Sequence, residues 1–149
     1  MKVLLPLLVL LLTLGCDRKL PERNVSGIEW RKEYHSALRE SEKRGRPVFL
    51  YFSALWCSWC REYEKELSRV APYISGNFIP LLLDSDRDRD LFLSFGGRGT
   101  PFTVVLSPRG RVLLSFHGSV RAEDLKDILS LSPSGKCPAH GEEGGLHPK

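Results

Sequence analysis

The sequence predicts one α/β domain with a central mixed β-sheet, and the arrangement of its apolar runs supports that fold class. Two runs of β-favouring residues, Val48–Phe52 and Ile79–Leu83, flank an amphipathic helical segment. This order is typical of a strand–helix–strand unit, which places the two strands parallel. A third run, Phe102–Leu106, precedes the turn sequence Ser107–Gly110, with proline second and glycine fourth. Arg111–Phe116 is then expected to return antiparallel to the third strand.

The composition fits one globular domain. The chain has 149 residues, of which 42% are hydrophobic and 27% charged, and its net charge is +4. That apolar content is sufficient to bury one core. Positive and negative side chains are mixed along the chain, without a basic stripe interleaved with aromatic residues. We therefore expect no nucleic-acid partner.

The first 15 residues have the layout of a secretory signal. Lys2 precedes the apolar run Val3–Leu14, which is too short to span the ~30 Å hydrocarbon core of a bilayer. The segment Leu12–Cys16 resembles the lipobox of bacterial lipoproteins, a family in which the cysteine is acylated and becomes the new N-terminus. The resemblance implies a signal peptide over residues 1–15, with lipidation of Cys16.

The polar residues 16–27 are expected to form a tether between the lipid anchor and the domain. Asp17 resembles the signal that retains some lipoproteins of Gram-negative bacteria in the inner membrane, which implies a periplasmic domain. Disulfides form and persist outside the cytoplasm, so cysteines of an exported chain can form disulfides. With Cys16 acylated, the remaining thiols are those of Cys57, Cys60 and Cys137.

The predicted domain covers residues 28–131, and its first helix is expected to begin at Ile28. Apolar residues recur at helical spacing from that point, and Gly45–Pro47 ends the helix. A second helix is predicted from about Cys57 to Val70, because one of its faces is apolar and the others carry charges.

The remaining helices are expected to be short. Pro72 and Gly76 are expected to interrupt regular secondary structure after the second helix. The charged run Asp84–Asp90 is predicted to be a solvated loop whose aspartates cap a helix at residues 91–95. A calcium site is disfavoured there, because the run lacks the spacing and the glycine of a calcium loop. Ser119 is expected to cap the last helix of the domain.

The chemistry is predicted at Cys57 and Cys60, where the first apolar strand meets the second helix. Unpaired N–H groups and the helix dipole at such a start favour negative charge. The thiolate of Cys57 should therefore be stabilised, which makes this cysteine the nucleophile. Cys60 lies on the same side, one turn further along, so it can attack the sulfur of Cys57 and close a disulfide. This arrangement predicts thiol–disulfide exchange.

Other roles for the cysteine pair are alternatives. A permanent disulfide across so few residues would remove little chain entropy. A closed zinc site needs four ligands, and no second CxxC or histidine pair follows at finger spacing. A copper-handling module would add ligands such as Cys137 and His140 from the Gly- and Pro-rich tail 132–149, which is expected to be disordered. A binding lipoprotein with a vestigial motif is the last alternative.

The chain resembles the thioredoxin superfamily, and within it the exported thioredoxin-like proteins. The resemblance rests on Trp56 before the first cysteine, on the cysteine pair, and on Gly99–Pro101 further along the chain. It implies a three-layer α/β/α fold with a cis peptide bond before Pro101. Trp56, Thr100 and Pro101 are then expected to bind substrate, with the Thr100 backbone pairing with the substrate chain. The opening strand of that fold has only Val25–Ile28 as a candidate.

The resemblance also implies an activity, that of a membrane-tethered thiol–disulfide oxidoreductase that reduces disulfide-containing proteins. It would need neither a cofactor nor a metal, and it would draw electrons from a membrane thiol donor. Three positions depart from the family pattern. Ser58 and Trp59 replace the Gly-Pro of thioredoxins, and Tyr51 stands where thioredoxins have a buried aspartate that helps to move the proton of the second cysteine. These departures leave the redox potential and the proton route open.

Overall fold

In the computed structural model, which describes residues 24–131, one four-stranded sheet has the order β2–β1–β3–β4. Its strands are β1 (Val48–Ser53), β2 (Ile79–Asp84), β3 (Phe102–Leu106) and β4 (Val112–His117). The helices are α2 (Tyr34–Arg44), α3 (Ser58–Arg69), α4 (Ala71–Asn77), α5 (Arg89–Ser94) and α6 (Ala122–Leu131). The predicted signal peptide, Cys16 and the tail lie outside the described residues.

The sheet is mixed, as predicted. β1 runs parallel to β2, with Leu50 opposite Leu81. β1 and β4 each pair antiparallel with β3. All six residues of β1 are buried, because this central strand is covered on both faces. That burial explains why the strand appears in the sequence as a continuous apolar run.

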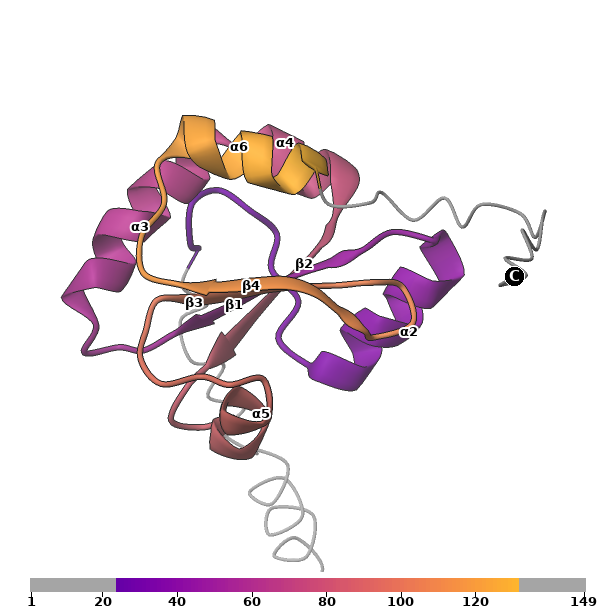
Figure 1. The fold of residues 1–149 in the computed structure, drawn as a ribbon, viewed down its shortest axis with the longest axis horizontal. Coiled ribbons are helices and arrows are strands. Elements are labelled where there is room, and N and C mark those ends of the chain that lie inside the picture. The colour runs from indigo at the N-terminus through magenta and orange to yellow at the C-terminus, as the bar shows by residue number, and fades with distance from the viewer. Residues whose placement is uncertain (1–23, 132–149) are drawn as a thin grey trace, which may run out of the picture.

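Successive side chains of β1 enter two separate cores, one on each face of the sheet. Phe49 and Tyr51 pack with both cysteines and with buried residues of α3, α4 and α6. Leu50 and Phe52 pack on the other face with buried residues of α2 and α5. Figure 1 shows the resulting layers, with α3, α4 and α6 on one side of the sheet and α2 and α5 on the other. The three-layer α/β/α fold is thus confirmed.

The first helix begins later than predicted. α2 starts at Tyr34, and the Glu33 carboxylate accepts hydrogen bonds from two N–H groups of its first turn. These bonds hold the pKa of Glu33 below its usual range. Ile28 and Trp30 are buried on either side of an exposed residue, which is the period of an extended chain. The prediction was wrong because this alternation leads directly into helical spacing.

The extended segment before α2 lies beside β2. Arg31 forms a parallel bridge with Leu81, and both backbone hydrogen bonds of Arg31 to β2 measure 2.9 Å. The pairing expected for an opening strand at Val25–Ile28 therefore occurs further along the chain, at Arg31. Arg31 is the one residue of the described segment before α2 that pairs with the sheet. Val25 is buried and the Ser26 hydroxyl donates to the Glu64 carbonyl at 2.6 Å. Packing thus begins within the residues predicted as tether.

Pro72 and Gly76 do not interrupt the helical structure as predicted, because both lie within α4. Pro72 occupies the first turn of that helix, where a backbone N–H would have no intrahelical partner. A proline at this position therefore costs little.

The loop after β2 is an Asx turn, and the helix caps predicted for its aspartates are not formed. The Asp84 carboxylate accepts hydrogen bonds from the backbone N–H groups of Asp86 and Arg87 at 2.9 and 3.1 Å. Asp88 stands at the start of α5 without a side-chain capping bond. α5 starts at Arg89, two residues earlier than expected.

The last helix is not capped as predicted. α6 begins at Ala122, and the N–H of Ala122 donates to the Glu66 carboxylate of α3 at 2.9 Å. A side chain 56 residues away therefore takes the place expected for Ser119. Leu125 and Leu129 are buried on the inner face of α6.

Gly97, in the loop before β3, offers a stability test. A methyl group on Gly97 would lie 2.4 Å from the ring carbons of Phe92, and that ring packs against Phe52 and Phe102 and has little room to move. We expect Gly97→Ala to lower the free energy of unfolding by about 1–3 kcal/mol in urea denaturation. Gly99→Ala is the control, since a methyl there meets nothing within 4 Å. Equal losses in both variants would contradict this packing argument.

Candidate functional site

Cys57 and Cys60 form a disulfide where β1 passes into α3. Their Cα atoms are 5.3 Å apart, within the usual range for a disulfide. Cys57 is the N-cap of α3, and its sulfur accepts a hydrogen bond from the N–H of Cys60 at 3.1 Å. The predicted position of the cysteine pair at a helix start is confirmed. An N–H directed at the Cys57 sulfur would also stabilise a thiolate there.

The two cysteines differ in burial. Cys57 retains 3% of its surface exposed and Cys60 retains none. Cys60 belongs to the core that also contains Tyr63 and Leu67. Of the two cysteines, only Cys57 therefore keeps any contact with solvent.

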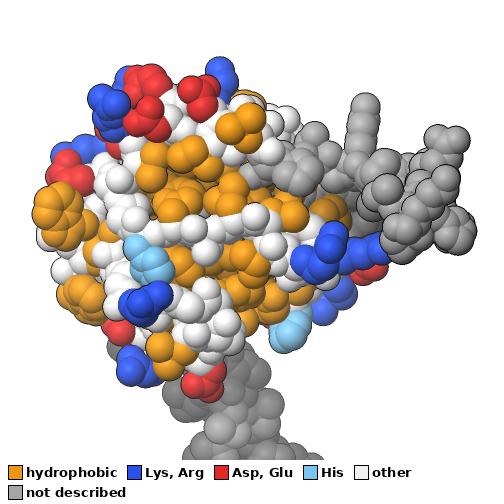
Figure 2. All heavy atoms as spheres, viewed as in Figure 1, with side chains coloured by type: hydrophobic (Ala, Val, Ile, Leu, Met, Phe, Trp, Pro, Cys, Tyr) orange, Lys and Arg blue, Asp and Glu red, His pale blue; other side chains and the backbone are white. Residues whose placement is uncertain are grey.

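Large exposed apolar side chains surround the disulfide. Leu55, Trp56 and Trp59 are 77%, 67% and 70% exposed. Figure 2 shows hydrophobic side chains at the left-hand edge of the molecule, over the N-terminal end of α3. The Trp56 indole N–H donates to the Asp86 carboxylate at 2.8 Å, so the loop after β2 holds this ring. Few soluble surfaces expose so much apolar area without a binding role.

The bond between Thr100 and Pro101 is cis, as the family resemblance implies. Pro101 is buried directly before β3, and the first residue of β3, Phe102, pairs with Phe52. This pairing brings Pro101 to the end of the sheet from which the chain continues into the cysteine motif. The Thr100 hydroxyl is buried without a hydrogen-bond partner in residues 24–131.

Tyr51 is fully buried beside the site. Its ring centroid lies 5.5 Å from that of Tyr63, and its hydroxyl lies 3.4 Å from a carboxylate oxygen of Glu64. Burial raises the pKa of both phenols well above the ordinary value, so neither tyrosine releases its proton at neutral pH. Glu64 belongs to no motif of the sequence, and its position four residues after Cys60, a helical-neighbour spacing, is the one signal that could have indicated it.

Neither a metal cluster nor a membrane span is found in the described part of the chain. Between residues 24 and 131, no three His, Cys, Asp or Glu side chains gather where they could hold a metal ion. The same residues contain no helix long and apolar enough to cross a membrane. The tail ligands of the copper alternative, Cys137 and His140, lie outside the described residues, as does Cys16.

Comparison with known proteins identifies the fold and the family. Residues 34–132 match the family model described as a thioredoxin-like domain. Thioredoxin-1 of Drosophila melanogaster is 26% identical over 95 residues, which cover 64% of this chain and 86% of that protein. The structure of a thioredoxin from Thermus thermophilus superposes with a TM-score of 0.63 at 24% identity, covering 80% of this chain and 98% of that one.

The structure of a DsbH oxidoreductase gives a TM-score of 0.59 at 19% identity, with 69% of this chain and 83% of that chain covered. At this identity the similarity shows the fold alone, whereas the family match covers well over half of the sequence. Together with the disulfide at the start of α3, these findings establish that the chain belongs to the thioredoxin-like family and is a thiol–disulfide oxidoreductase.

Proposed function

We propose that this protein is an extracytoplasmic, membrane-tethered thiol–disulfide reductase in which Cys57 is the nucleophile and Cys60 the resolving thiol. The observation that carries the assignment of these two roles is that Cys57 and Cys60 differ in hydrogen bonding and in burial. Cys57 receives an N–H hydrogen bond at the helix start and is the outer of the pair, whereas Cys60 is fully buried. Attack therefore falls to Cys57, and resolution to Cys60.

The reaction transfers two electrons from the reduced pair to a substrate disulfide. The Cys57 thiolate attacks one substrate sulfur, and the other substrate sulfur leaves as a thiolate and takes a proton from water. The sulfur of Cys60, having lost its proton, then attacks Cys57 and displaces the second substrate thiolate. The product is the Cys57–Cys60 disulfide, which a membrane thiol donor would reduce again.

The exposed apolar side chains around the disulfide support a docking surface for disulfide-containing proteins. Trp56 and Trp59 lie on either side of Cys57 in the sequence, and Asp86 fixes the Trp56 ring. Thr100 and Pro101 would add backbone contacts along an extended substrate segment, in the manner of an added strand. Aromatic side chains of this size commonly dominate binding energy when they become buried.

The location rests on the first 27 residues. The signal layout and Cys16 support export and lipidation, and Asp17 favours retention at the inner membrane. Two or three acyl chains hold a protein durably at a membrane, whereas one chain binds only marginally. A reductase placed there would act on disulfides that form outside the cytoplasm.

The reduction potential of the Cys57–Cys60 pair tests the proposed direction. Equilibration of the protein with glutathione or dithiothreitol buffers, followed by alkylation of free thiols, gives this potential. A reductase is expected near the roughly −270 mV of thioredoxin. A potential near about −120 mV, typical of a strong oxidant, would show that the protein oxidises its substrates.

Trp59→Ala is expected to weaken substrate docking. Loss of an exposed aromatic ring beside the disulfide should lower kcat/KM for insulin reduction by about 5–30-fold, mainly through KM, as for other interface tryptophans. Val112→Ala is the control, because Val112 is an exposed apolar residue that pairs with Leu106 at the opposite end of the sheet. If Trp59→Ala and Val112→Ala give the same KM as the parent, the apolar surface does not dock substrate.

A further inference from the structure

The burial of Cys60 creates a requirement for a proton acceptor. Cys60 has no exposed surface, and apolar surroundings disfavour the charged thiolate. Resolution nevertheless requires the proton of Cys60 to leave as its sulfur attacks Cys57. A proton acceptor near the sulfur of Cys60 would therefore speed resolution.

The neighbouring phenols are unsuited to this task. Tyr63 packs in the same core as Cys60, and its hydroxyl shares a hydrogen bond of 3.1 Å with Thr103. Tyr51 lies beside Tyr63. Because burial raises the pKa of both tyrosines, both phenols remain protonated and neither can accept the proton of Cys60.

Glu64 brings a carboxylate to this region. It stands one helical turn after Cys60 on α3, where side chains four residues apart are neighbours. One oxygen of Glu64 lies 3.4 Å from the Tyr51 hydroxyl and 3.4 Å from the Ser53 hydroxyl. Both hydroxyls belong to β1, the strand that leads into Cys57. The carboxylate of Glu64 therefore lies between the strand and the helix that hold the two cysteines.

The acidic residues on either side of Glu64 in α3 have other partners. Glu62 forms an exposed ion pair with Lys65 at 2.9 Å. Glu66 pairs with Arg69 and accepts the first N–H of α6. Glu64, in contrast, contacts the buried residues Tyr51 and Ser53 of β1.

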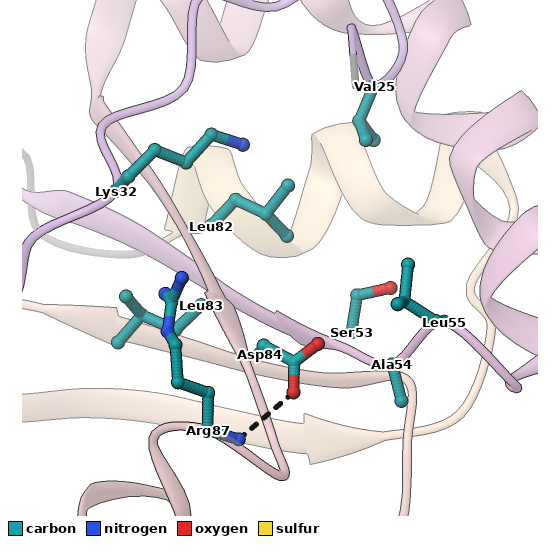
Figure 3. Close-up of a pocket in the computed structure, with 9 residues that line it drawn as sticks. All are labelled: Val25, Lys32, Ser53, Ala54, Leu55, Leu82, Leu83, Asp84 and Arg87. Carbon is teal, nitrogen blue, oxygen red and sulfur yellow. Dashed lines mark hydrogen bonds between the residues drawn. The ribbon is translucent and has the colours of Figure 1, made fainter. Parts of the chain in front are cut away.

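A surface pocket offers the proton a route to solvent. The pocket measures about 140 Å³ and is lined by Ser53 and Ala54 at the end of β1, which leaves room for several water molecules. Figure 3 shows the charged groups around it. They come from the segment before α2, from the end of β2 and from the loop that follows: Lys32, Asp84 and Arg87. Ser53, whose hydroxyl lies 3.4 Å from the Glu64 carboxylate, connects that carboxylate to the pocket.

We propose that Glu64 accepts the proton of Cys60 during resolution of the mixed disulfide, an inference that rests on the proposed function. The Glu64 carboxylate takes the proton as the Cys60 sulfur forms its bond to the Cys57 sulfur. The bond between Cys57 and the substrate sulfur breaks, and the electron pair leaves with the substrate thiolate. One negative charge thus passes from Glu64 to the departing thiolate, and Glu64 then returns its proton to water in the pocket.

The test isolates the resolving step. The full chain, carrying Cys16→Ser and Cys137→Ser, is reduced and treated at pH 4 with one equivalent of 5,5′-dithiobis(2-nitrobenzoate), which leaves a thionitrobenzoate adduct on Cys57. A stopped-flow jump to pH 5–9 then records the release of the second thionitrobenzoate by Cys60. Glu64→Gln is expected to slow this release about tenfold or more between pH 6 and 7, within the range of general-base effects.

The pH profile separates proton transfer from structure. In Glu64→Gln the rate should rise about tenfold per pH unit, because it then follows only the thiolate fraction. Glu64→Asp, which keeps the carboxylate, should recover part of the rate, and Glu62→Gln should match the parent. A Glu64→Gln profile parallel to that of the parent, slower or not, would overturn the role of Glu64. A parent that forms the adduct but never releases the second thiolate would instead refute the proposed function.

Discussion

Cys60→Ser is expected to turn the protein from a catalyst into a trap that holds substrate on Cys57. Without the inner sulfur, the mixed disulfide has no resolving thiol on α3, so the substrate stays attached. Incubation of the reduced variant with insulin should give a higher-mass adduct on a non-reducing gel, and dithiothreitol should release it. Catalytic turnover of insulin should fall to the rate measured without protein.

Cys57→Ser provides the contrast. A serine hydroxyl is not ionised at neutral pH and cannot replace the thiolate as nucleophile, and Cys60 has no exposed surface from which to attack. We therefore expect neither adduct nor turnover from this variant. Adducts that form in Cys57→Ser but not in Cys60→Ser would reverse the roles assigned to the two cysteines. A variant that carries both Cys57→Ser and Cys60→Ser controls for reaction at Cys16 and Cys137.

Features determined by local sequence were predictable. β1, β2 and β3 appear as continuous apolar runs because the layers above and below cover them, as the full burial of β1 illustrates. The position of Cys57 at a helix start follows from the strand before it and the amphipathic pattern after it. For the same reason Phe102–Leu106 was predicted with the bounds that β3 has.

Contacts between elements distant in the sequence were not predictable from local patterns. The N-terminal cap of α6 comes from Glu66 on α3, so no residue next to the helix indicates it. Arg31 bridges to β2 through backbone groups, which carry no side-chain signal. The approach of Glu64 to Tyr51 depends on the packing of α3 against β1. Tyr51 thus stands at the position where thioredoxins have a buried aspartate, and the carboxylate of Glu64, from α3, lies against its hydroxyl.

The two-core arrangement implies that stability and chemistry can be perturbed separately. Phe52→Ala is expected to cost about 3–5 kcal/mol of unfolding free energy, because it empties a fully buried site. The Phe52 ring lies 5.3 Å from that of Phe92 and stacks on that of Phe102 at 5.9 Å. For a domain of this size the midpoint of thermal unfolding should fall by more than about 10 °C, as circular dichroism can measure.

Phe52 faces the core opposite the cysteines, so the folded variant should keep its disulfide chemistry. Well below its unfolding midpoint, Phe52→Ala should release thionitrobenzoate from the Cys57 adduct at the rate of the parent. Leu93→Ala, a half-exposed change on α5, controls for substitution on that side and should alter stability by less than about 0.5 kcal/mol. If folded Phe52→Ala resolved the adduct slowly, the sheet would transmit packing changes from one face to the other, and the two cores would not be independent. If folded Phe52→Ala instead releases thionitrobenzoate at the rate of the parent, the residues that control attack by Cys60 lie on the face of the sheet that carries Cys60, Tyr51 and Glu64.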